Sequence, residues 1–327
     1  MQSWPDIFSK FKGLNVLIIG DVMVDAYIWG AVERISPEAP VPIINVRKRN
    51  FRLGGAANVA LNIQALGAKP VLCGLVGQDE NGKRLLHLLE DKGMSKEGIV
   101  MSSSRPTTVK ARVIAADQHV VRVDDESDAV ATDEEESKLL DKIQQLLPDC
   151  HVVIFEDYDK GVVTPTLIEA IVKLAKAKGI PTAVDPKKRN FLHYQNVTLF
   201  KPNLKELRDG LKIEIDPKDE SSLNRAVDLV KSKLGVEGVM LTLSEQGVFI
   251  NYQGQKLKLP AHNRAIADVS GAGDTVISIA ALCVALQLSP DRIAALSNLG
   301  GGLVCQHVGV VPIDREELLR EALEKNL

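Results

Sequence analysis

The stretch Asn15-Val16-Leu17-Ile18-Ile19-Gly20-Asp21 indicates the fold, because four apolar residues in a row stop at a glycine and an acid. A short run of this kind, closed by polar or turn residues, is typical of a β-strand. Similar runs alternate with segments of helical period along the chain. This alternation predicts an α/β protein of three layers, with a mainly parallel central sheet flanked by helices.

The same alternation continues to the end of the chain, while its length of 327 residues leaves one domain or two open. Strands are expected at 71–76, 151–155, 181–185 and 238–243, a hairpin around 251–254, and helices at 84–89, at 167–177 and from Ala272 and Pro290.

Two stretches lack this alternation of apolar strand runs with helical segments. Residues 25–46 contain three prolines and little helical period, and residues 107–123 alternate apolar with polar positions. Because both are inserted between βα units, we expect them to form a small β-sheet. It would act as a lid over the carboxyl edge of the main sheet, where open α/β sheets bind ligands. A plain surface hairpin is the alternative.

The composition is that of a soluble globular protein, with 40 Lys and Arg residues against 43 Asp and Glu. A formal charge of -3 gives no overall field that would gather nucleic acid or an anionic membrane, so neither is an expected partner. The longest nearly apolar run, 276–288, is too short to span a bilayer, and we expect a cytoplasmic protein. The four cysteines are expected to be buried, reduced thiols. The acidic run 124–136 is interpreted as a solvated loop and helix start.

Asp268-Val-Ser-Gly-Ala-Gly-Asp274-Thr275 is the most informative motif, because a Gly-Ala-Gly turn leads directly into an apolar helix. Small residues at a helix N-terminus let a phosphate approach the backbone amides, and the helix dipole stabilises its charge. We expect Gly271, Ala272 and Gly273 to form this anion hole. Asp274 would repel the anion, so its expected task is to accept a proton from an attacking hydroxyl. Helix capping by Asp274 is the alternative.

A second helix start with small residues is Leu53-Gly54-Gly55-Ala56-Ala57-Asn58. The paired glycines indicate that a ligand or another segment comes close to the backbone. Asn58 and Asn62 lie four residues apart on one helical face and could hydrogen-bond sugar hydroxyls. Tight packing of the small residues on the sheet explains the pattern equally well.

Lys201-Pro-Asn203-Leu-Lys-Glu206 places an amide and an acid at the start of a short helix after a strand. Asn203 and Glu206 could direct a hydrated Mg²⁺. Capping of the helix by Asn203 accounts for the pair nearly as well.

Gly77-Gln-Asp-Glu-Asn-Gly-Lys-Arg84 has the spacing of a phosphate-binding P-loop between a strand and a helix. Arg84 replaces the hydroxyl that would bind Mg²⁺, and the interior of the loop is acidic. We therefore do not expect a working P-loop.

Residues 54–58 and 268–275 together resemble the two diagnostic motifs of the ribokinase-like (phosphofructokinase B) carbohydrate kinases. The resemblance implies a single ribokinase-like kinase domain over residues 1–327 with a small β-lid. It also implies an enzyme that uses ATP at the carboxyl edge of the sheet. Further positions of the family pattern are filled by Asp21, Asp25, Asn203 and Glu206.

The resemblance also implies roles for single residues. Asp274 would be the catalytic base, and the backbone from Gly271 to Gly273 would be the anion hole. The residues expected at the sugar are Asp25, Gly54, Gly55 and Asn58.

ATP and Mg²⁺ are the cofactors that the resemblance implies. Thr242, Ser244 and Gly247 follow a strand and resemble the loop on the triphosphate side, while Asn298 is on the helix at the adenine side. Asp268 and the loop before Val310 resemble the site where many relatives hold K⁺. The residues expected to serve a metal ion are Asn203, Glu206 and Asp268.

Within this family, residues 34–42, 107–112 and 156–161 resemble the heptose-7-phosphate kinases of lipopolysaccharide synthesis. The implied reaction phosphorylates D-glycero-D-manno-heptose 7-phosphate at its anomeric oxygen and gives the 1,7-bisphosphate for ADP-heptose synthesis. Such enzymes are often fused to a nucleotidyltransferase with an H-x-G-H motif. The 327 residues contain no such motif, so we expect a separate nucleotidyltransferase to act downstream.

A substrate that already bears a phosphate needs cations at the end remote from the reacting hydroxyl. Taken singly, each candidate is explained as well by an ordinary surface charge. The candidates in the lid or at the ends of strands are Arg34, Lys110, Arg112, Lys160 and Lys187.

Two other functions are compatible with the motifs. A kinase for another sugar or sugar phosphate, such as ribose, fructose or tagatose 6-phosphate, is opposed only by the lid and by residues 156–161. A catalytically silent sugar-binding regulator would need neither Asp274 nor its glycine cradle. Lids of this family often pair, so we expect a homodimer that binds a small-molecule sugar phosphate.

Overall fold

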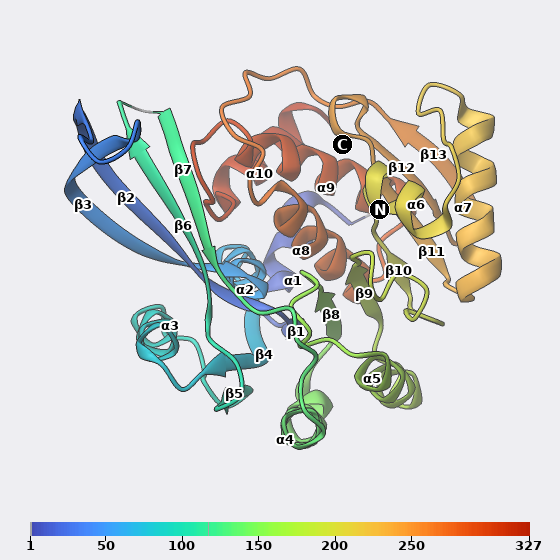
Figure 1. Cartoon of the computed structure of the whole chain (residues 1–327). Coiled ribbons are helices and arrows are strands. Elements are labelled where there is room, and N and C mark those ends of the chain that lie inside the picture. Colours follow the sequence, from blue (N-terminus) through green and yellow to red (C-terminus); the bar gives the residue numbers. More distant parts are fainter. Residues whose placement is uncertain (1, 117) are drawn as a thin grey trace.

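A mainly parallel sheet forms the centre of the computed structural model, which describes residues 2–116 and 118–327 (Figure 1). Its strands are β1 (Asn15–Gly20), β4 (Lys69–Gly77), β5 (Ile99–Ser102), β8 (Val152–Glu156), β9 (Thr182–Asp185), β10 (Leu199–Phe200), β11 (Gly238–Thr242), β12 (Val248–Tyr252) and β13 (Gln255–Leu259). Within the described residues they lie in the order β13-β12-β11-β10-β9-β8-β1-β4-β5. Neighbours from β5 to β11 are parallel, and β12 and β13 form an antiparallel edge. The predicted parallel sheet and the hairpin near 251–254 are confirmed.

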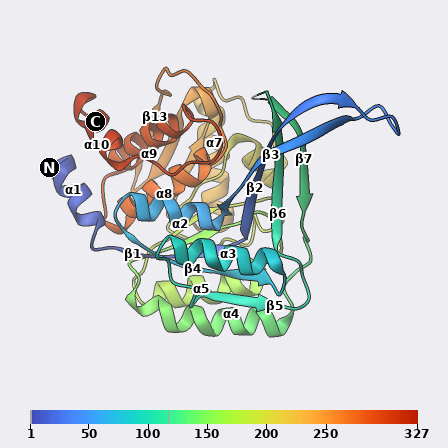
Figure 2. The same ribbon diagram turned by 90° about the vertical axis from the view of Figure 1, so that its left-hand side faces the viewer.

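Helices cover both faces of this sheet, and Figure 2 shows the two layers from the side. The helices α1 (Trp4–Phe11), α2 (Ala56–Ala65), α8 (Ala272–Ala285), α9 (Pro290–Val304) and α10 (Arg315–Glu324) contribute to the core on one face. The helices α4 (Asp133–Leu146), α5 (Pro165–Ala177), α6 (Leu204–Leu211) and α7 (Glu220–Leu234) contribute to the core on the other. A further helix, α3 (Glu80–Asp91), joins the first core through Leu85 and Leu89.

The first strand, β1, shows why the strands of the main sheet appear in the sequence as unbroken apolar runs. Val16 and Ile18 belong to one core, Leu17 and Ile19 to the other, and all four are fully buried. Successive side chains of a strand point to opposite faces, so both faces must be apolar when helices cover both. Burial of each such side chain contributes about 1.5–3 kcal/mol.

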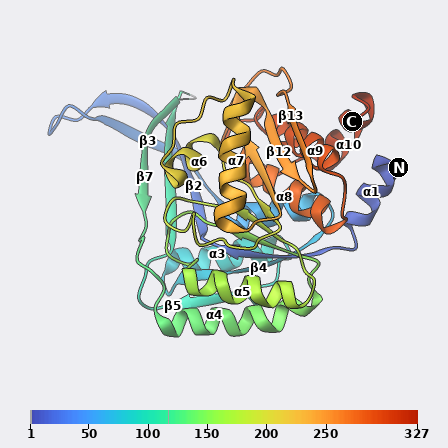
Figure 3. The ribbon, with the colours of Figure 1, turned by 90° about the vertical axis from the view of Figure 1, so that its right-hand side faces the viewer.

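A second sheet forms the lid, with strand order β3-β2-β6-β7. Its strands are β2 (Val22–Ile35), β3 (Pro42–Gly55), β6 (Thr108–Ala115) and β7 (Gln118–Asp125). The sheet predicted from residues 25–46 and 107–123 is therefore present, although Asp117 lies outside the described residues. The first two lid strands extend beyond the predicted range 25–46. Strand β2 begins at Val22, two residues after the end of β1, and β3 continues to Gly55, the residue before α2. The β2–β3 pair projects away from the helical layers (Figure 3).

The chain passes from the main sheet into the lid at Gly20. A Cβ at this position would lie 1.9 Å from the carbonyl oxygen of Glu156, so no larger residue fits between β1 and β8. The next amide, of Asp21, donates to the same carbonyl at 3.2 Å. This close approach brings Asp21 and Glu156 together at the carboxyl edge of the sheet.

The two ends of the described chain also meet, since Trp4 Nε1 donates to the carbonyl oxygen of Leu327 at 2.7 Å. All four cysteines are buried and free, as predicted. No helix formed by residues 2–116 and 118–327 has both the length and the apolar character needed to cross a membrane.

Candidate active site

The carboxyl edge of the main sheet gathers charged residues from adjacent strands. Glu156 ends β8, Asp185 ends β9 and Lys201 directly follows β10. A Cβ at Gly273 would lie 3.4 Å from Asp185 Oδ2 and 3.8 Å from Lys201 Nζ, which places the first turn of α8 against this edge. Open α/β sheets bind ligands at such an edge.

Asp274 lies in the first turn of α8 and is 6% exposed. Its Oδ2 accepts a hydrogen bond from Asn58 Nδ2 at 2.7 Å, and its Oδ1 accepts one from the Tyr158 hydroxyl at 2.8 Å. Burial raises the pKa of Asp274, although both hydrogen bonds act to lower it. Both hydrogen bonds to the Asp274 carboxylate therefore come from side chains of the candidate site. Its raised pKa suits it to accept a proton.

Tyr158 was not singled out from the sequence, yet it is one of the two donors to Asp274. Burial and the nearby Asp274 raise the pKa of Tyr158 well above its usual value. Its hydroxyl therefore keeps its proton and serves as a permanent donor to the carboxylate.

The two asparagines of α2 have different partners. Asn62 is bonded entirely within the protein: its Nδ2 donates to the Asn58 carbonyl, and its Oδ1 accepts from Thr275 Oγ1 at 3.0 Å and from the amide of Ile313 at 3.0 Å. Asn58 Oδ1 is buried and has no hydrogen-bond partner in the described part of the chain. Of the pair, only Asn58 retains an acceptor for a ligand.

Gly271, which precedes α8, has φ +80°, a left-handed conformation that favours glycine. A Cβ there would lie 3.1 Å from Asn58 Nδ2 and 3.2 Å from Val310 Cγ1. The following residues, Ala272 and Gly273, are the first of α8, and amides in this position lack partners within the helix. The arrangement can bind an anion through these amides and the helix dipole.

Five charged side chains cluster at the carboxyl edge of the sheet beside the first turn of α8. They are Glu156, Asp185, Lys187, Lys201 and Glu206. Lys201 Nζ lies 2.8 Å from Asp185 Oδ2, and Lys187 Nζ pairs with both Asp185 and Glu206. Burial acts to raise the pKa of Asp185, but the two lysines lower it below its usual value. Burial and the charge of Asp185 raise the pKa of Glu156 well above its usual value. Glu156 and Lys201 were not assigned roles from the sequence, because their partners come from other strands.

Asn203 and Glu206 form the capping box that was the alternative to metal binding. Asn203 Oδ1 accepts from the Glu206 amide at 2.8 Å, and Glu206 Oε2 accepts from the Asn203 amide at 2.8 Å. The remaining oxygen of Glu206 accepts from Lys187. The oxygens that were expected to direct Mg²⁺ are thus occupied by protein donors.

Glu156 and Asp185 fit a hydrated Mg²⁺ better. Both carboxylate oxygens of Glu156 and Oδ1 of Asp185 are buried without a hydrogen-bond partner among the described residues. No three His, Cys, Asp or Glu side chains in that part of the chain are arranged as a metal site. Mg²⁺ does not require three, because it commonly keeps several waters and is held by one or two carboxylates and by substrate phosphates.

On the lid side, Asp25 is buried and forms an ion pair with Arg112 of the neighbouring strand β6. A Cβ at Gly54 would lie 2.3 Å from Asp25 Oδ2, so the glycine makes room for this carboxylate. Gly55 has φ +59° and connects β3 to α2. The structure thus brings together the lid acid, the paired glycines and the helix that carries Asn58.

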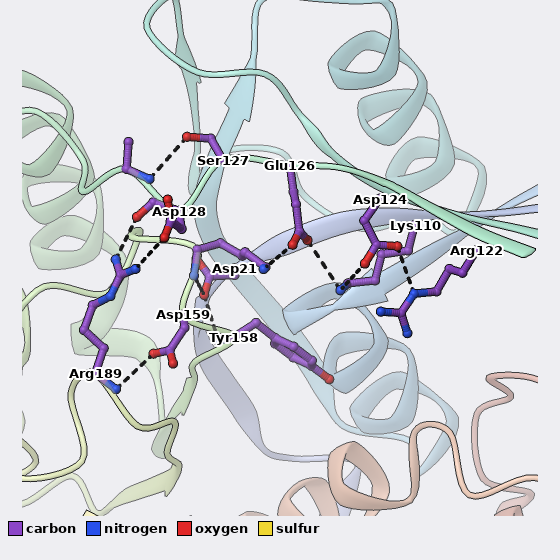
Figure 4. Close-up of polar contacts among 12 residues, drawn as sticks. Asp21, Lys110, Arg122, Asp124, Glu126, Ser127, Asp128, Tyr158, Asp159 and Arg189 are labelled. Atoms are coloured by element: carbon purple, nitrogen blue, oxygen red, sulfur yellow. Dashed lines mark hydrogen bonds and ion pairs between the residues drawn. The ribbon is translucent and has the colours of Figure 1, made fainter.

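Lys110 and Lys160 also lie together, in the network drawn in Figure 4. Glu126 bridges them, with Oε1 at 2.6 Å from Lys160 Nζ and Oε2 at 3.5 Å from Lys110 Nζ. Asp124 lies 3.7 Å from Lys110 Nζ. The interpretation of the acidic run 124–136 as a solvated loop is therefore wrong for Glu126, although α4 begins within the run as expected.

Two of the predicted phosphate-binding cations lie elsewhere. Arg34 is exposed on β2, nine residues beyond Asp25, which is roughly 30 Å along an extended strand. Lys187 pairs with Asp185 and Glu206 rather than with the lid acids. Sequence position could not separate these two from Lys110, Arg112 and Lys160, because all five follow or lie in strands.

The residues expected at the nucleotide lie on the β11 side of the sheet. Thr242 forms an isolated parallel bridge with Asn203, and Ser244 begins the short helix η2 (Ser244–Gln246). Gly247 has φ +88°, and a Cβ there would lie 2.0 Å from the Leu259 carbonyl oxygen. Asn298 Nδ2 donates to the carbonyl of Pro260 at 2.8 Å, so α9 and residues 243–261 are held together.

Asp268 organises the loop that leads to α8. Its Oδ1 accepts from the Ser270 amide and its Oδ2 from the Gly309 amide, both at 2.9 Å. Burial acts to raise the pKa of Asp268, but these hydrogen bonds lower it below its usual value. Both oxygens therefore hold the backbone of residues 268–270 and 309.

In the P-loop-like segment, Asp79 caps α3. Its Oδ1 accepts from the Gly82 amide at 2.7 Å and its Oδ2 from the Thr107 amide at 2.7 Å. The acid thus takes an amide that a P-loop would offer to phosphate.

Asp21 shapes the loop after β8, a role that was not foreseen. Its Oδ2 accepts from the amides of Tyr158 at 2.7 Å and Lys160 at 3.1 Å, and its Oδ1 accepts from that of Val162 at 3.2 Å. Burial, with the charge of Asp157, raises the pKa of Asp21 to about 6. One carboxylate thus positions the loop that carries both Tyr158 and Lys160.

The model of the pfkB family carbohydrate kinases matches residues 14–316. Among curated proteins, the chain is similar to the bifunctional protein HldE of Desulfatibacillum aliphaticivorans, with 40% identity over 311 residues. That match covers 95% of this chain and 63% of the relative, so the chain spans a little under two thirds of the relative's length.

Two solved structures share the fold at low sequence identity. Phosphofructokinase-2 from Escherichia coli in complex with potassium has a TM-score of 0.79 at 18% identity, over 96% of this chain and 99% of that one. Ribokinase from Arabidopsis thaliana complexed with ribose and ATP has a TM-score of 0.71 at 18% identity, over 94% and 99%. The expected ribokinase-like fold is confirmed.

The loop-holding role of Asp21 can be tested with Asp21→Asn. The new NH₂ group cannot accept from the backbone amides, so residues 158–162 should loosen and displace Tyr158 from Asp274. We expect kcat to fall by about 10- to 100-fold, the cost of a small misplacement of catalytic groups. Steady-state kinetics measures this, with Asp159→Asn in the same loop as the control.

The same variant should alter the pH dependence of stability. The native pKa of Asp21 is about 6, above its ordinary value of 3.8, so the native state binds this proton more tightly than the unfolded state does. The stabilisation is complete below the unfolded value and is lost as pH rises to about 6. Urea unfolding from pH 4 to 7 should show this loss in the wild type and less of it in Asp21→Asn. Equal pH profiles together with unchanged kcat would contradict the role.

Proposed function

We propose, for a chain that belongs to the pfkB family of carbohydrate kinases, the ATP-dependent phosphorylation of D-glycero-D-manno-heptose 7-phosphate at its anomeric oxygen. Family membership makes the chain an ATP-dependent sugar kinase. The heptose is supported by the identity to a protein named HldE and by the resemblance of residues 156–161 to heptose-7-phosphate kinases. The observation that carries the chemistry is the buried Asp274 carboxylate beside the first amides of α8.

In this reaction Asp274 accepts the proton of the anomeric hydroxyl as that oxygen attacks the γ-phosphorus of ATP. The bond from the γ-phosphorus to the β–γ bridging oxygen breaks, and ADP leaves. Asn58 and Tyr158 hold the two carboxylate oxygens in place. Asn58 Oδ1 is free to accept a hydrogen bond from a sugar hydroxyl. The raised pKa of Asp274 makes it a stronger base than an exposed aspartate.

The transferred phosphoryl group lies over the amides of Ala272 and Gly273. These amides and the helix dipole stabilise its negative charge, and the neighbouring Lys201 adds a cation. Mg²⁺, when bound, neutralises charge on the phosphates. Glu156 and Asp185 are the side chains that would hold the ion, directly or through water, because both oxygens of Glu156 and Oδ1 of Asp185 are buried without a hydrogen-bond partner among the described residues.

Thr242, Ser244 and Gly247, on the β11 side of the sheet, would hold the phosphates of ATP, and Asn298 would serve the adenine side, as the sequence resemblance implies. The loop of Asp268 and Val310 would hold K⁺ through backbone carbonyls, as the sequence resemblance suggests.

The 7-phosphate of the sugar binds at the lid, where Lys110 and Lys160 meet. Charge-assisted hydrogen bonds from two lysines are stronger than neutral ones, and a sugar without the phosphate forgoes them. Arg112 and Asp25 lie beside this pair and contact the sugar. The bisphosphate product would then be the substrate of a nucleotidyltransferase reaction.

The general-base role predicts a large kinetic effect for Asp274→Asn. The amide cannot take the proton, so kcat should fall by about 100-fold or more while ATP binding is nearly unchanged. Rapid-quench measurement of ADP release and titration with ATP separate the two effects. Near-normal turnover would leave Asp274 with only a structural role.

Substrate choice is tested on a panel of phosphorylated and unphosphorylated sugars. We expect the highest kcat/KM with D-glycero-D-manno-heptose 7-phosphate. Mass spectrometry should show that the product has gained one phosphate, and ³¹P NMR should place this phosphate on the anomeric oxygen. Lys160→Ala should raise KM for the sugar phosphate and spare KM for ATP. Equal turnover of ribose or fructose would assign the chain to another sugar, and binding without turnover would favour a regulator.

A homodimer formed through the lid is supported by apolar side chains on its surface. Val32, Val46, Val121 and Val123 are 43–55% exposed, more than a monomer surface needs. Val121 and Val123 lie two residues apart on one face of β7. Sedimentation velocity should show a dimer in the wild type and mainly monomer after Val121→Asp with Val123→Asp. Val130→Asp, outside the lid, is the matched control, and a monomeric wild type would exclude the dimer.

A further inference from the structure

The lysine pair at the lid is already bridged by an internal anion. Glu126, the first residue after β7, has one carboxylate oxygen on each ammonium group, at 2.6 Å from Lys160 Nζ and 3.5 Å from Lys110 Nζ (Figure 4). The three side chains are only 16–26% exposed. A phosphate that contacts both lysines would need the positions that these two oxygens occupy.

The two lysines are held in place by different parts of the chain. Lys110 lies on β6, where it is the register partner of Asp25 on the adjacent strand β2. The amide of Lys160 donates to Asp21, and its carbonyl accepts from Arg105, so its backbone is fixed at both polar groups. The backbone of both lysines is therefore held by contacts that do not involve Glu126.

Glu126 itself is only partly satisfied. Its Oε1 accepts from Lys160, but its Oε2 is buried without a hydrogen-bond partner among the described residues and has only the longer contact to Lys110. An anion with more oxygens and more charge can satisfy both ammonium groups better. A phosphate monoester carries about -1.5 to -2 charges at neutral pH, against -1 for a carboxylate.

We propose that Glu126 occupies the phosphate subsite of the free enzyme and is exchanged for the phosphate group of the substrate. This inference rests on the proposed function of the lysine pair and adds to it a residue that determines specificity. In the free enzyme Glu126 neutralises two adjacent cations that would otherwise repel each other. A neutral sugar cannot displace it, so the subsite stays closed to unphosphorylated sugars.

The competition predicts that removing the charge strengthens phosphate binding. In Glu126→Gln, KM for the sugar phosphate and the inhibition constant of inorganic phosphate should both fall by about two- to tenfold, the equivalent of one or two partly exposed ion pairs. A side chain that merely held the lysines in place would give the opposite sign. Asp128→Asn, in the same segment and paired with the exposed Arg189, should leave both constants unchanged.

A binding measurement makes the test independent of turnover. Inorganic phosphate, titrated calorimetrically and in thermal unfolding, should bind more tightly to Glu126→Gln and raise its Tm more than that of the wild type. If this variant is too unstable, Glu126→Asp, which is too short to bridge both lysines, should shift the affinity in the same direction. Unchanged or weaker phosphate binding would overturn the exchange.

The outcome can be separated from that of the proposed function. If Lys110→Ala and Lys160→Ala weaken phosphate binding but Glu126→Gln does not strengthen it, the subsite is correct and the exchange is wrong. If phosphorylated and unphosphorylated sugars are turned over equally, the proposed substrate is wrong, and the inorganic phosphate titration still decides the role of Glu126.

Discussion

Two hydrogen bonds to one buried carboxylate join three segments that are distant in sequence. Asn58 comes from α2, Tyr158 from the loop after β8, and Asp274 from α8. A carboxylate that leaves water costs several kcal/mol unless donors replace the lost water. The relative positions of the two helices and the loop are therefore tied to the need to satisfy Asp274. The lid strands, the first amides of α8 and the charged edge of the sheet are all attached to these three segments.

The site has opposite electrostatic needs at its two ends. Near α8, three acids, Glu156, Asp185 and Glu206, face two lysines, so the fully ionised cluster carries one excess negative charge. A proton on Glu156 cancels that excess, and a divalent cation more than offsets it. At the lid, the cations are neutralised by side chains of the lid itself. A ligand that brings a metal ion to one end and an anion to the other fits both.

Much of the fold could be predicted from local patterns. Apolar runs such as residues 15–19 mark buried strands because both faces of the sheet are covered, and the alternation in residues 107–123 marks a sheet with one polar face. The Gly-Ala-Gly turn before Asp274 was informative because few structures need small residues and an acid together at a helix start. Each of these signals lies within one short segment of the sequence.

The parts of the site that were missed depend on the order of the strands. Lys201 and Glu156 gain their roles from Asp185 on a neighbouring strand, and no local pattern gives that neighbour. Asp21 was noticed as a family position, but its three amide donors lie about 140 residues later in the chain. Glu126 was hidden in an acidic run because its sequence neighbours are solvated. Arg34 was instead expected at the site and lies far from it. Its position in the lid did not place it near the site, because strand β2 is long.

One connection between the lid and the candidate site contains no loop. Strand β3 ends at Gly55 and α2 begins at the next residue, so a 14-residue strand joins directly to the helix that carries Asn58. The direction of this long arm at Gly55 therefore also fixes where α2 begins, and with it the Asn58 amide that donates to Asp274. One continuous piece of backbone thus couples the position of the lid hairpin to the alignment of the buried carboxylate.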